Sequence, residues 1–373
     1  MKRVMGLAVL LVMGLYSFVV VGQSDRLTVV ASFSILADVV QNVTLGQADV
    51  SSLIPVGADP HGYEPSARDL AALSEADVIF VAGGGFEEQL LDAIAGAAPD
   101  VPVIEASDCV QVRYFGIASD VDAHDETTTA KSPMGIDIES ICDAVDAKTA
   151  DVDSLKEAMG LGSVRVPVDL NRPRFFEAGC SHSDAESGPN ADVEHGVCDP
   201  HVWSDPRNVF YWSLFIGEVL GVLDPGNADQ YAANAEEYAY AIDDLARLEL
   251  EAGLVAIPPQ DRVLLTNHET LGYFAEAYEF ELVGFVLPGG STLAEPSAQD
   301  LAALIELVRS SGVKAIFVET TVASRVAEQV ASETGVPIVP LYTDSLSDAD
   351  GAAATYLDYM AYNFTTITDA LAP

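Results

Sequence analysis

Short apolar segments rich in β-branched residues alternate with helix-length segments through both halves of this sequence. Strands are expected over residues 27–31, 50–54, 78–82, 101–105, 263–266, 280–286, 315–318 and 338–341. Helices are expected over residues 34–45, 67–76, 86–97, 208–223, 271–278, 298–310, 323–333 and 352–371. Strands that are apolar along their whole length are buried on both faces, so the pattern predicts an α/β fold with parallel sheets covered by helices.

One longer helical segment separates the two halves. Apolar residues recur there at spacings of three and four, namely Tyr231, Ala235, Tyr238, Ile242, Leu245, Leu248 and Ala252. A helix over 228–252 would be about 37 Å long at about 1.5 Å per residue, which is enough to lie along two lobes as a rigid connector. A surface helix within one lobe is the alternative. The total length of 373 residues fits two domains.

The charge of the chain limits its partners. Its 17 lysines and arginines are outnumbered by 58 aspartates and glutamates, which gives a formal net charge of -41. A polyanion of this size repels nucleic acids and anionic membrane surfaces, so nucleic acid is not expected as a partner. Most of the acidic residues are expected to form a solvated face that aids solubility.

Residues 1–24 have the composition of a signal peptide or an N-terminal anchor. Lys2 and Arg3 precede an uncharged apolar run from residue 4 to residue 21. The run is long for a signal peptide and short for a spanning helix, so cleavage and retention both stay open. No cysteine ends the run, which argues against a bacterial lipoprotein anchor. The sequence therefore predicts an extracytoplasmic protein, in the periplasm or at the cell surface.

All four cysteines lie in a region, at about residues 108–199, where the alternation of strands and helices weakens. We expect a long insertion in the first lobe that is held by disulfides, which fits an oxidising compartment. Three connectivities are possible. Pairing of sequence neighbours is predicted, Cys109 with Cys142 and Cys180 with Cys198.

Two histidine loops and two later polar residues make up a candidate metal site. His61 and His201 stand in Asp-Pro-His loops of the first half, whereas His268 and Asp344 directly follow predicted strands of the second half. Open α/β sheets bind ligands beyond the carboxyl ends of their strands. Neutral imidazoles together with a carboxylate suit a tetrahedral divalent ion. These four residues are therefore the candidate ligands.

Purely structural roles are also open for these four residues. A single histidine at a strand end is commonly hydrogen-bonded within the fold, and an aspartate there commonly caps the next helix. Glu319 is an alternative carboxylate ligand, and Glu269 a further one. The insertion contains three more histidines, of which His182 and His195 either collect metal transiently or belong to an exposed loop; metal binding by His124 is also open.

Several motifs occur in a fixed order along the chain. They are Asp59-Pro60-His61 with Glu64-Pro65-Ser66 and Asp69-Leu70, Asp199-Pro200-His201-Val202-Trp203-Ser204-Asp205-Pro206, Asn267-His268 with Tyr273-Phe274-Ala275, Glu295-Pro296-Ser297 with Asp300-Leu301, the segment 312–319, and the loop 342–346 with Tyr356, Met360 and Asn363. In these motifs the chain resembles the cluster A-I metal-specific solute-binding proteins of ABC transporters, a group that contains zinc- and manganese-uptake receptors.

The resemblance implies two Rossmann-like lobes with parallel sheets, joined by one long helix, with a metal ion in the cleft between them. The N-terminal lobe would then span 25–227, the linker helix 228–254 and the C-terminal lobe 255–373. The family's ligand positions match His61, His201, His268 and Asp344. A histidine at the third position is typical of zinc-type sites, whereas manganese receptors often carry glutamate there.

The expected function is capture of Zn2+ and its delivery to an ABC permease by a monomer that is not an enzyme. An Mn2+ receptor of the same class is the first alternative. The second is a zinc-dependent hydrolase, because three histidines can hold a catalytic zinc with an open fourth position. The chain departs from the family in lacking the lipobox cysteine and a dense histidine tract, and in having four cysteines in the insertion.

Overall fold

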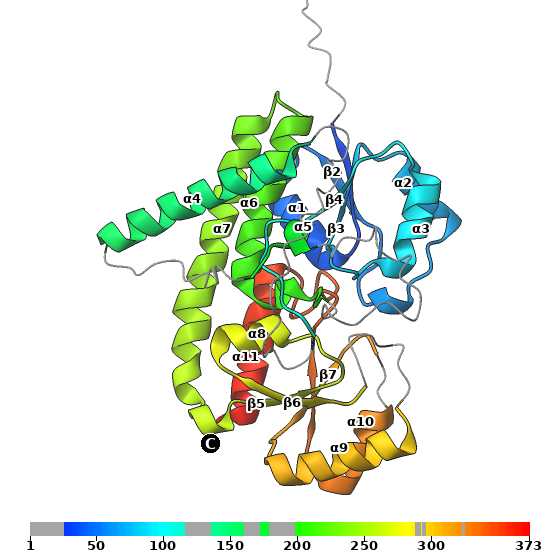
Figure 1. The fold of residues 1–373 in the computed structure, drawn as a ribbon, viewed down its shortest axis with the longest axis vertical. Coiled ribbons are helices and arrows are strands. Elements are labelled where there is room, and N and C mark those ends of the chain that lie inside the picture. The colour runs from blue at the N-terminus through cyan, green and yellow to red at the C-terminus, as the bar shows by residue number, and fades with distance from the viewer. Residues whose placement is uncertain are drawn as a thin grey trace, which may run out of the picture.

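One four-stranded parallel sheet lies in the upper part of the molecule and another in the lower part, as Figure 1 shows. This computed structural model describes residues 26–115, 136–159, 172–178, 198–287, 292, 296–322 and 325–373. The predicted signal or anchor segment lies outside the described residues, as do Cys180, His124, His182 and His195. All eight predicted strands are present, so the α/β class is confirmed.

The N-terminal sheet has the order β2-β1-β3-β4 and is parallel throughout. Its strands are β1 (Thr28–Ala31), β2 (Asp49–Ser52), β3 (Val78–Val81) and β4 (Val103–Glu105). Helices α2 (Ala67–Ser74) and α3 (Glu88–Ala97) lie on one side of this sheet, and α1 (Ser34–Thr44) lies on the other side with α6 (Pro206–Leu223). Every residue of β3 is buried, as expected for a strand covered on both faces.

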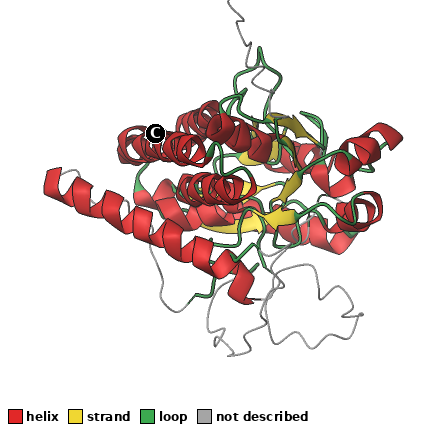
Figure 2. Ribbon diagram, turned by 90° about the horizontal axis from the view of Figure 1, so that it is seen from above, coloured by secondary structure: helices red, strands yellow, loops and turns green. Residues whose placement is uncertain are grey.

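The C-terminal sheet repeats the same order as β6-β5-β7-β8. Its strands are β5 (Val263–Thr266), β6 (Glu281–Phe285), β7 (Ile316–Glu319) and β8 (Ile338–Leu341). Helices α9 (Ala298–Ser311) and α10 (Arg325–Thr334) cover its outer face, whereas α8 (Gly272–Tyr278) and α11 (Tyr356–Leu371) lie on the side of the other lobe. Figure 2 shows helices around both sets of strands.

The same capping motif begins a helix in each lobe. Ser66 accepts a hydrogen bond from the backbone of Asp69, whose side chain accepts one in return, and this capping box begins α2. Ser297 and Asp300 form the same box at the start of α9. Each box satisfies backbone N–H groups that the first helical turn leaves unpaired.

The long helical segment connects the two lobes. Helix α7 (Ala228–Leu245) packs along α6 and α1 and continues through a π-helical turn, η5 (Ala246–Glu251), that contacts α11. Figure 1 shows it running from one lobe to the other. We predicted one uninterrupted α-helix with a single apolar stripe over residues 228–252, and this prediction was wrong beyond Leu245. A π turn has more residues per turn, so Leu248 points outward at 63% exposure and Leu250 is buried instead.

The insertion contains a helix that the sequence analysis did not predict. Helix α4 (Ile138–Met159) lies across α6, and one end of it projects from the body of the molecule (Figures 1 and 2). The predicted disulfide between Cys109 and Cys142 is confirmed and ties α4 to the loop after β4. Cys198 is also disulfide-bonded. A short helix, α5 (Phe175–Ala178), precedes a further gap in the described chain.

Candidate metal centre

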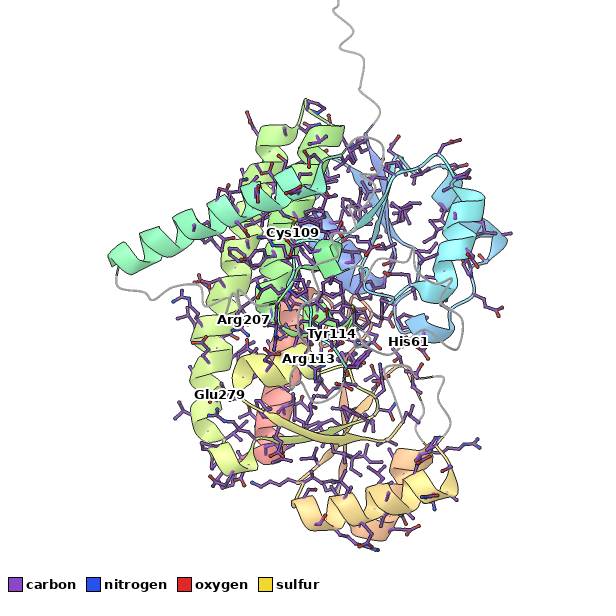
Figure 3. All side chains as sticks on the ribbon, viewed as in Figure 1. His61, Cys109, Arg113, Tyr114, Arg207 and Glu279 are labelled. Carbon is purple, nitrogen blue, oxygen red and sulfur yellow. A yellow bond between two sulfur atoms is a disulfide. The ribbon has the colours of Figure 1, made fainter. Side chains whose placement is uncertain are left out.

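The four predicted ligands come together between the lobes, each from a loop or short turn. His61 lies in a 3-10 turn, η1 (Pro60–Gly62), after β2, and His201 directly precedes another, η4 (Val202–Ser204). His268 follows β5 and Asp344 follows β8. One potential ligand atom from each of these residues lies within 4.8 Å of the others. Figure 3 shows His61 at the level where the two lobes meet.

The donor atoms of this cluster point at one another and are buried. The ring centroids of His61, His201 and His268 are 5.2 to 5.7 Å apart. Asp344 Oδ2 lies 3.7 Å from His61 Nε2 and 3.6 Å from His268 Nε2. All three Nε2 atoms and both carboxylate oxygens of Asp344 are buried without a hydrogen-bond partner. Buried polar atoms are nearly always paired, so five orphaned atoms in one place indicate a binding site.

The repeated Asp-Pro-His sequence explains why two of the histidines are presented alike. The carboxylate of Asp59 accepts a hydrogen bond from the backbone N–H of His61, at 3.0 Å. The carboxylate of Asp199 accepts the same bond from His201, also at 3.0 Å. These are local turns of the kind that aspartate side chains commonly form with the backbone two residues further on. The two turns therefore give His61 and His201 the same local backbone arrangement.

Two buried carboxylates contact the far sides of the histidine rings. Asp199 Oδ1 lies 2.9 Å from His201 Nδ1, and Glu319 contacts His268 Nδ1. A carboxylate at Nδ1 holds the proton on that nitrogen and leaves Nε2 with a free lone pair, which is the arrangement that metal-binding histidines usually have. Glu319 therefore orients a ring rather than joining the cluster itself. Nothing in the sequence distinguished this role from that of a ligand.

The contacts of Glu269 indicate a structural role, whereas those of Asp344 indicate a ligand role. Glu269 pairs with Arg113, at 3.0 Å, and is not in the cluster. Asp344 does not cap a helix, because both of its oxygens lack a hydrogen-bond partner. Among the described residues, no second group of histidine, cysteine, aspartate and glutamate side chains has this convergence.

Two aromatic side chains that the sequence analysis did not single out as site residues line the cluster. The ring of Phe86 lies 5.4 Å from that of His61 and 4.7 Å from that of Trp203. Trp203 lies 5.4 Å from His201, and its indole N–H donates to the backbone oxygen of Thr343, next to Asp344. An apolar wall of this kind excludes water and lowers the local dielectric constant.

Burial dominates the electrostatics of the cluster. It lowers the pKa of His61 to about 2 and that of His268 to about 4, and it raises the pKa of Asp344 to about 6. Burial also acts to lower the pKa of His201, but the hydrogen bond and charge of Asp199 outweigh it and leave that pKa raised. In the metal-free site, burial therefore disfavours the charged forms of His61, His268 and Asp344. A divalent cation would supply the positive charge that the buried carboxylate lacks.

Comparison with known proteins identifies the family. The family described as "Zinc-uptake complex component A periplasmic" matches residues 29–370. The chain belongs to this family. Members of the periplasmic zinc-uptake component family are substrate-binding parts of transporters, so the protein is an extracytoplasmic metal-binding component of an ABC transporter. This confirms the predicted class and location.

Two known proteins illustrate how similar the relatives of this chain are to it. The manganese-binding lipoprotein MntA of Halalkalibacterium halodurans is 28% identical over 350 residues, which are 93% of this chain and 89% of that protein. The manganese ABC transporter substrate-binding lipoprotein PsaA of Streptococcus pneumoniae serotype 4 is 26% identical over 349 residues, with 93% and 90% covered.

Solved structures show the same two-lobed fold. The Mn-bound periplasmic metal binding protein from candidatus Liberibacter asiaticus has a TM-score of 0.65 and 25% identity, and covers 93% of this chain and 100% of its own. The periplasmic zinc binding protein TroA from Treponema pallidum has a TM-score of 0.66 at 23% identity with the same coverage, and supports the fold alone. Within the described residues, no helix combines the length and apolarity that crossing a bilayer requires.

Proposed function

We propose that this protein binds Zn2+ outside the cytoplasm through His61, His201, His268 and Asp344 and delivers it to an ABC permease. The observation that carries the proposal is the convergence of buried donor atoms without partners, three imidazole nitrogens and two carboxylate oxygens. Leaving such atoms unpaired is costly, and a tetrahedral divalent cation would satisfy them together. The metal is the cargo of the protein, so the site must also be able to release it.

The donor set favours zinc over manganese. Three imidazoles and one carboxylate suit Zn2+, whereas Mn2+ prefers sites richer in oxygen. Asp199 and Glu319 contact Nδ1 of His201 and His268 and so are not among the proposed ligands. This supports a ligand set in which nitrogen predominates. The names of several relatives specify manganese, and an Mn2+ receptor of the same transporter class is therefore the alternative.

Three further features belong to the proposal. Residues 25–227 and 255–373 are proposed as the lobes and 228–254 as the linker, with an N-terminal signal or anchor before them. The protein is proposed to act as a monomer. In this arrangement Asp344 takes the coordination position that a catalytic zinc leaves open for water, so the site suits binding rather than hydrolysis.

A competition titration tests the proposal directly. The protein lacking residues 1–24 is stripped with a chelator and titrated with Zn2+ and with Mn2+ against an indicator of known affinity. His268→Ala removes one proposed ligand. Tyr278→Phe serves as the control, because Tyr278 is a buried residue of the same lobe that lies outside the ligand cluster.

We expect one tightly bound Zn2+ per chain, little uptake of Mn2+, and a loss of more than about 100-fold in zinc affinity in His268→Ala. Loss of a positioning contact alone typically costs about 10- to 100-fold, so loss of a ligand should exceed it. Equal or preferred binding of Mn2+ would change the metal but keep the site. If neither ion binds stoichiometrically, the functional proposal is wrong.

A further inference from the structure

A buried arginine outside the ligand set contacts both halves of the candidate metal centre. Arg113 donates from Nη1 to Asp199 Oδ2, at 2.6 Å, and from Nη2 to Glu269 Oε1, at 3.0 Å. Only 13% of its side chain is exposed. Asp199 orients His201 of the N-terminal lobe, and Glu269 directly follows His268 of the C-terminal lobe. One guanidinium group thus joins the two loops that carry these histidines, and Figure 3 shows Arg113 at the junction of the lobes.

Backbone contacts reinforce the same junction. The backbone N–H of Arg113 donates to the hydroxyl oxygen of Tyr273, at 2.8 Å, and that hydroxyl donates to the backbone oxygen of Asp199, at 3.1 Å. The backbone N–H of Asp199 in turn donates to the backbone oxygen of Arg113, at 2.7 Å. Because Tyr273 lies on α8, the C-terminal lobe is docked directly on the segment that holds Arg113.

A glycine makes room for the guanidinium group. A Cβ atom added to Gly272, at the start of α8, would lie 2.1 Å from Arg113 Nη1 and 2.5 Å from Asp199 Oδ2. Real Cβ atoms do not approach other heavy atoms so closely, so an alanine here would displace the arginine, the aspartate or the helix. The guanidinium group thus occupies space that is open only because residue 272 has no Cβ.

We infer that Arg113 is a positioning residue that holds the ligand loops of the two lobes together and thereby slows release of the bound metal. The inference rests on the proposed function. A planar guanidinium can reach two carboxylates at once with fixed geometry, which an ammonium group cannot reproduce. Carboxylates that orient metal-binding histidines commonly affect metal affinity by about 10- to 100-fold. A purely local ion pair would affect the stability of the fold without affecting metal release.

Variants that change no charge and no proposed ligand distinguish the positioning role from that of a purely local ion pair. Arg113→Lys retains the positive charge but loses the two-pronged contact, and Gly272→Ala places a Cβ in the space of the Arg113–Asp199 pair. The matched controls are Arg207→Lys, at an arginine that is 17% exposed and pairs with Asp205, and Gly96→Ala, at a helical glycine with nothing within 4 Å of an added Cβ. None of these four substitutions changes the net charge around the metal.

The measurement is the rate at which the zinc-loaded protein transfers its metal to an excess of a chromogenic chelator. We expect Arg113→Lys and Gly272→Ala to bind one Zn2+ per chain but to release it at least about 10-fold faster than the wild type. The controls should stay within about twofold. Substituting Co2+ for Zn2+ gives a second readout, because its visible absorption should change in the two test variants if His201 is reoriented.

Release as slow as in the wild type from both test variants, with an unchanged Co2+ spectrum, overturns the inference. This result is distinct from failure of the proposed function, in which the wild type itself binds no stoichiometric metal. Using two test variants keeps the test decisive if one of them fails to fold.

Discussion

Replacing Asp344 by asparagine should stabilise the metal-free protein while abolishing tight metal binding. Asp344 is 1% exposed, and neither of its carboxylate oxygens has a hydrogen-bond partner. In the absence of a cation, an ionised carboxylate in such a place is unfavourable. Asparagine has nearly the same shape as a protonated aspartate and carries no charge, so it removes the cost of ionisation and leaves the packing intact.

The size of the effect follows from the pKa of this carboxyl group. Burial raises it from 3.8 to about 6. Since each pKa unit corresponds to about 1.36 kcal/mol, the ionised side chain destabilises the metal-free fold by about 3 kcal/mol near pH 7. The folded state holds this proton more tightly than the unfolded state, so the cost is complete above about pH 6 and disappears as the pH falls to about 3.8. The advantage of Asp344→Asn should shrink over the same range.

Urea unfolding in the presence of a chelator, at several pH values, measures this difference. We expect the variant to be more stable than the wild type by about 3 kcal/mol near pH 7 and by about half as much near pH 5. Asp348→Asn, at an exposed carboxylate four residues further on, should change stability by less than about 0.5 kcal/mol. A variant no more stable than the wild type near pH 7, or a gain that does not depend on pH, would refute the reasoning.

Three other variants give separate tests. Glu319→Gln should weaken Zn2+ binding by about 10-fold or more in calorimetric titration. Burial raises the pKa of Glu319 to about 8 without metal, but a bound cation favours its ionised form, and a neutral amide orients His268 less strongly than that carboxylate does; unchanged affinity would contradict the assigned role. Replacing Cys109 and Cys142 together by alanine opens a loop with a sequence separation of 33 residues and should cost about 3–4 kcal/mol in chemical unfolding. Gly217→Ala places a Cβ 2.8 Å from that of Ala235 on the neighbouring helix, and thermal unfolding should show a loss of about 1–3 kcal/mol.

The strands and the candidate ligands could be predicted because their signals are local. Short, largely apolar segments mark most of the strands, and the Asp-Pro-His turns at His61 and His201 are complete within three residues. Helix α4 was missed although a local signal exists. Ile138, Ile141, Cys142 and Val145 are all buried and have helical spacing, but the many acidic residues around them weaken the apolar pattern.

The positioning residues could not have been found in the same way, because their partners are distant in the sequence. Arg113 lies 86 residues from Asp199 and 156 residues from Glu269. Glu319 lies 51 residues from His268. Such contacts depend on how two separately folded loops are brought together, and no periodicity along the chain encodes that.

The π turn at Ala246–Glu251 also could not be predicted from the sequence, since tertiary packing selects it over the α-helix that the residue spacing indicates.

Among the described residues, the second sheet also divides the buried apolar side chains into two clusters. Leu264 and Phe317 belong to a large core that continues through α6, α7 and α11 into the first sheet, whereas their neighbours Leu265 and Ile316 belong to a small core under α9 and α10. Cooperative units of unfolding follow such cores rather than the outlines of lobes. Amide hydrogens of α9 and α10 should therefore exchange with solvent through a partial opening that leaves the large core intact. That opening would run along the outer face of the second sheet rather than through the cleft between the lobes.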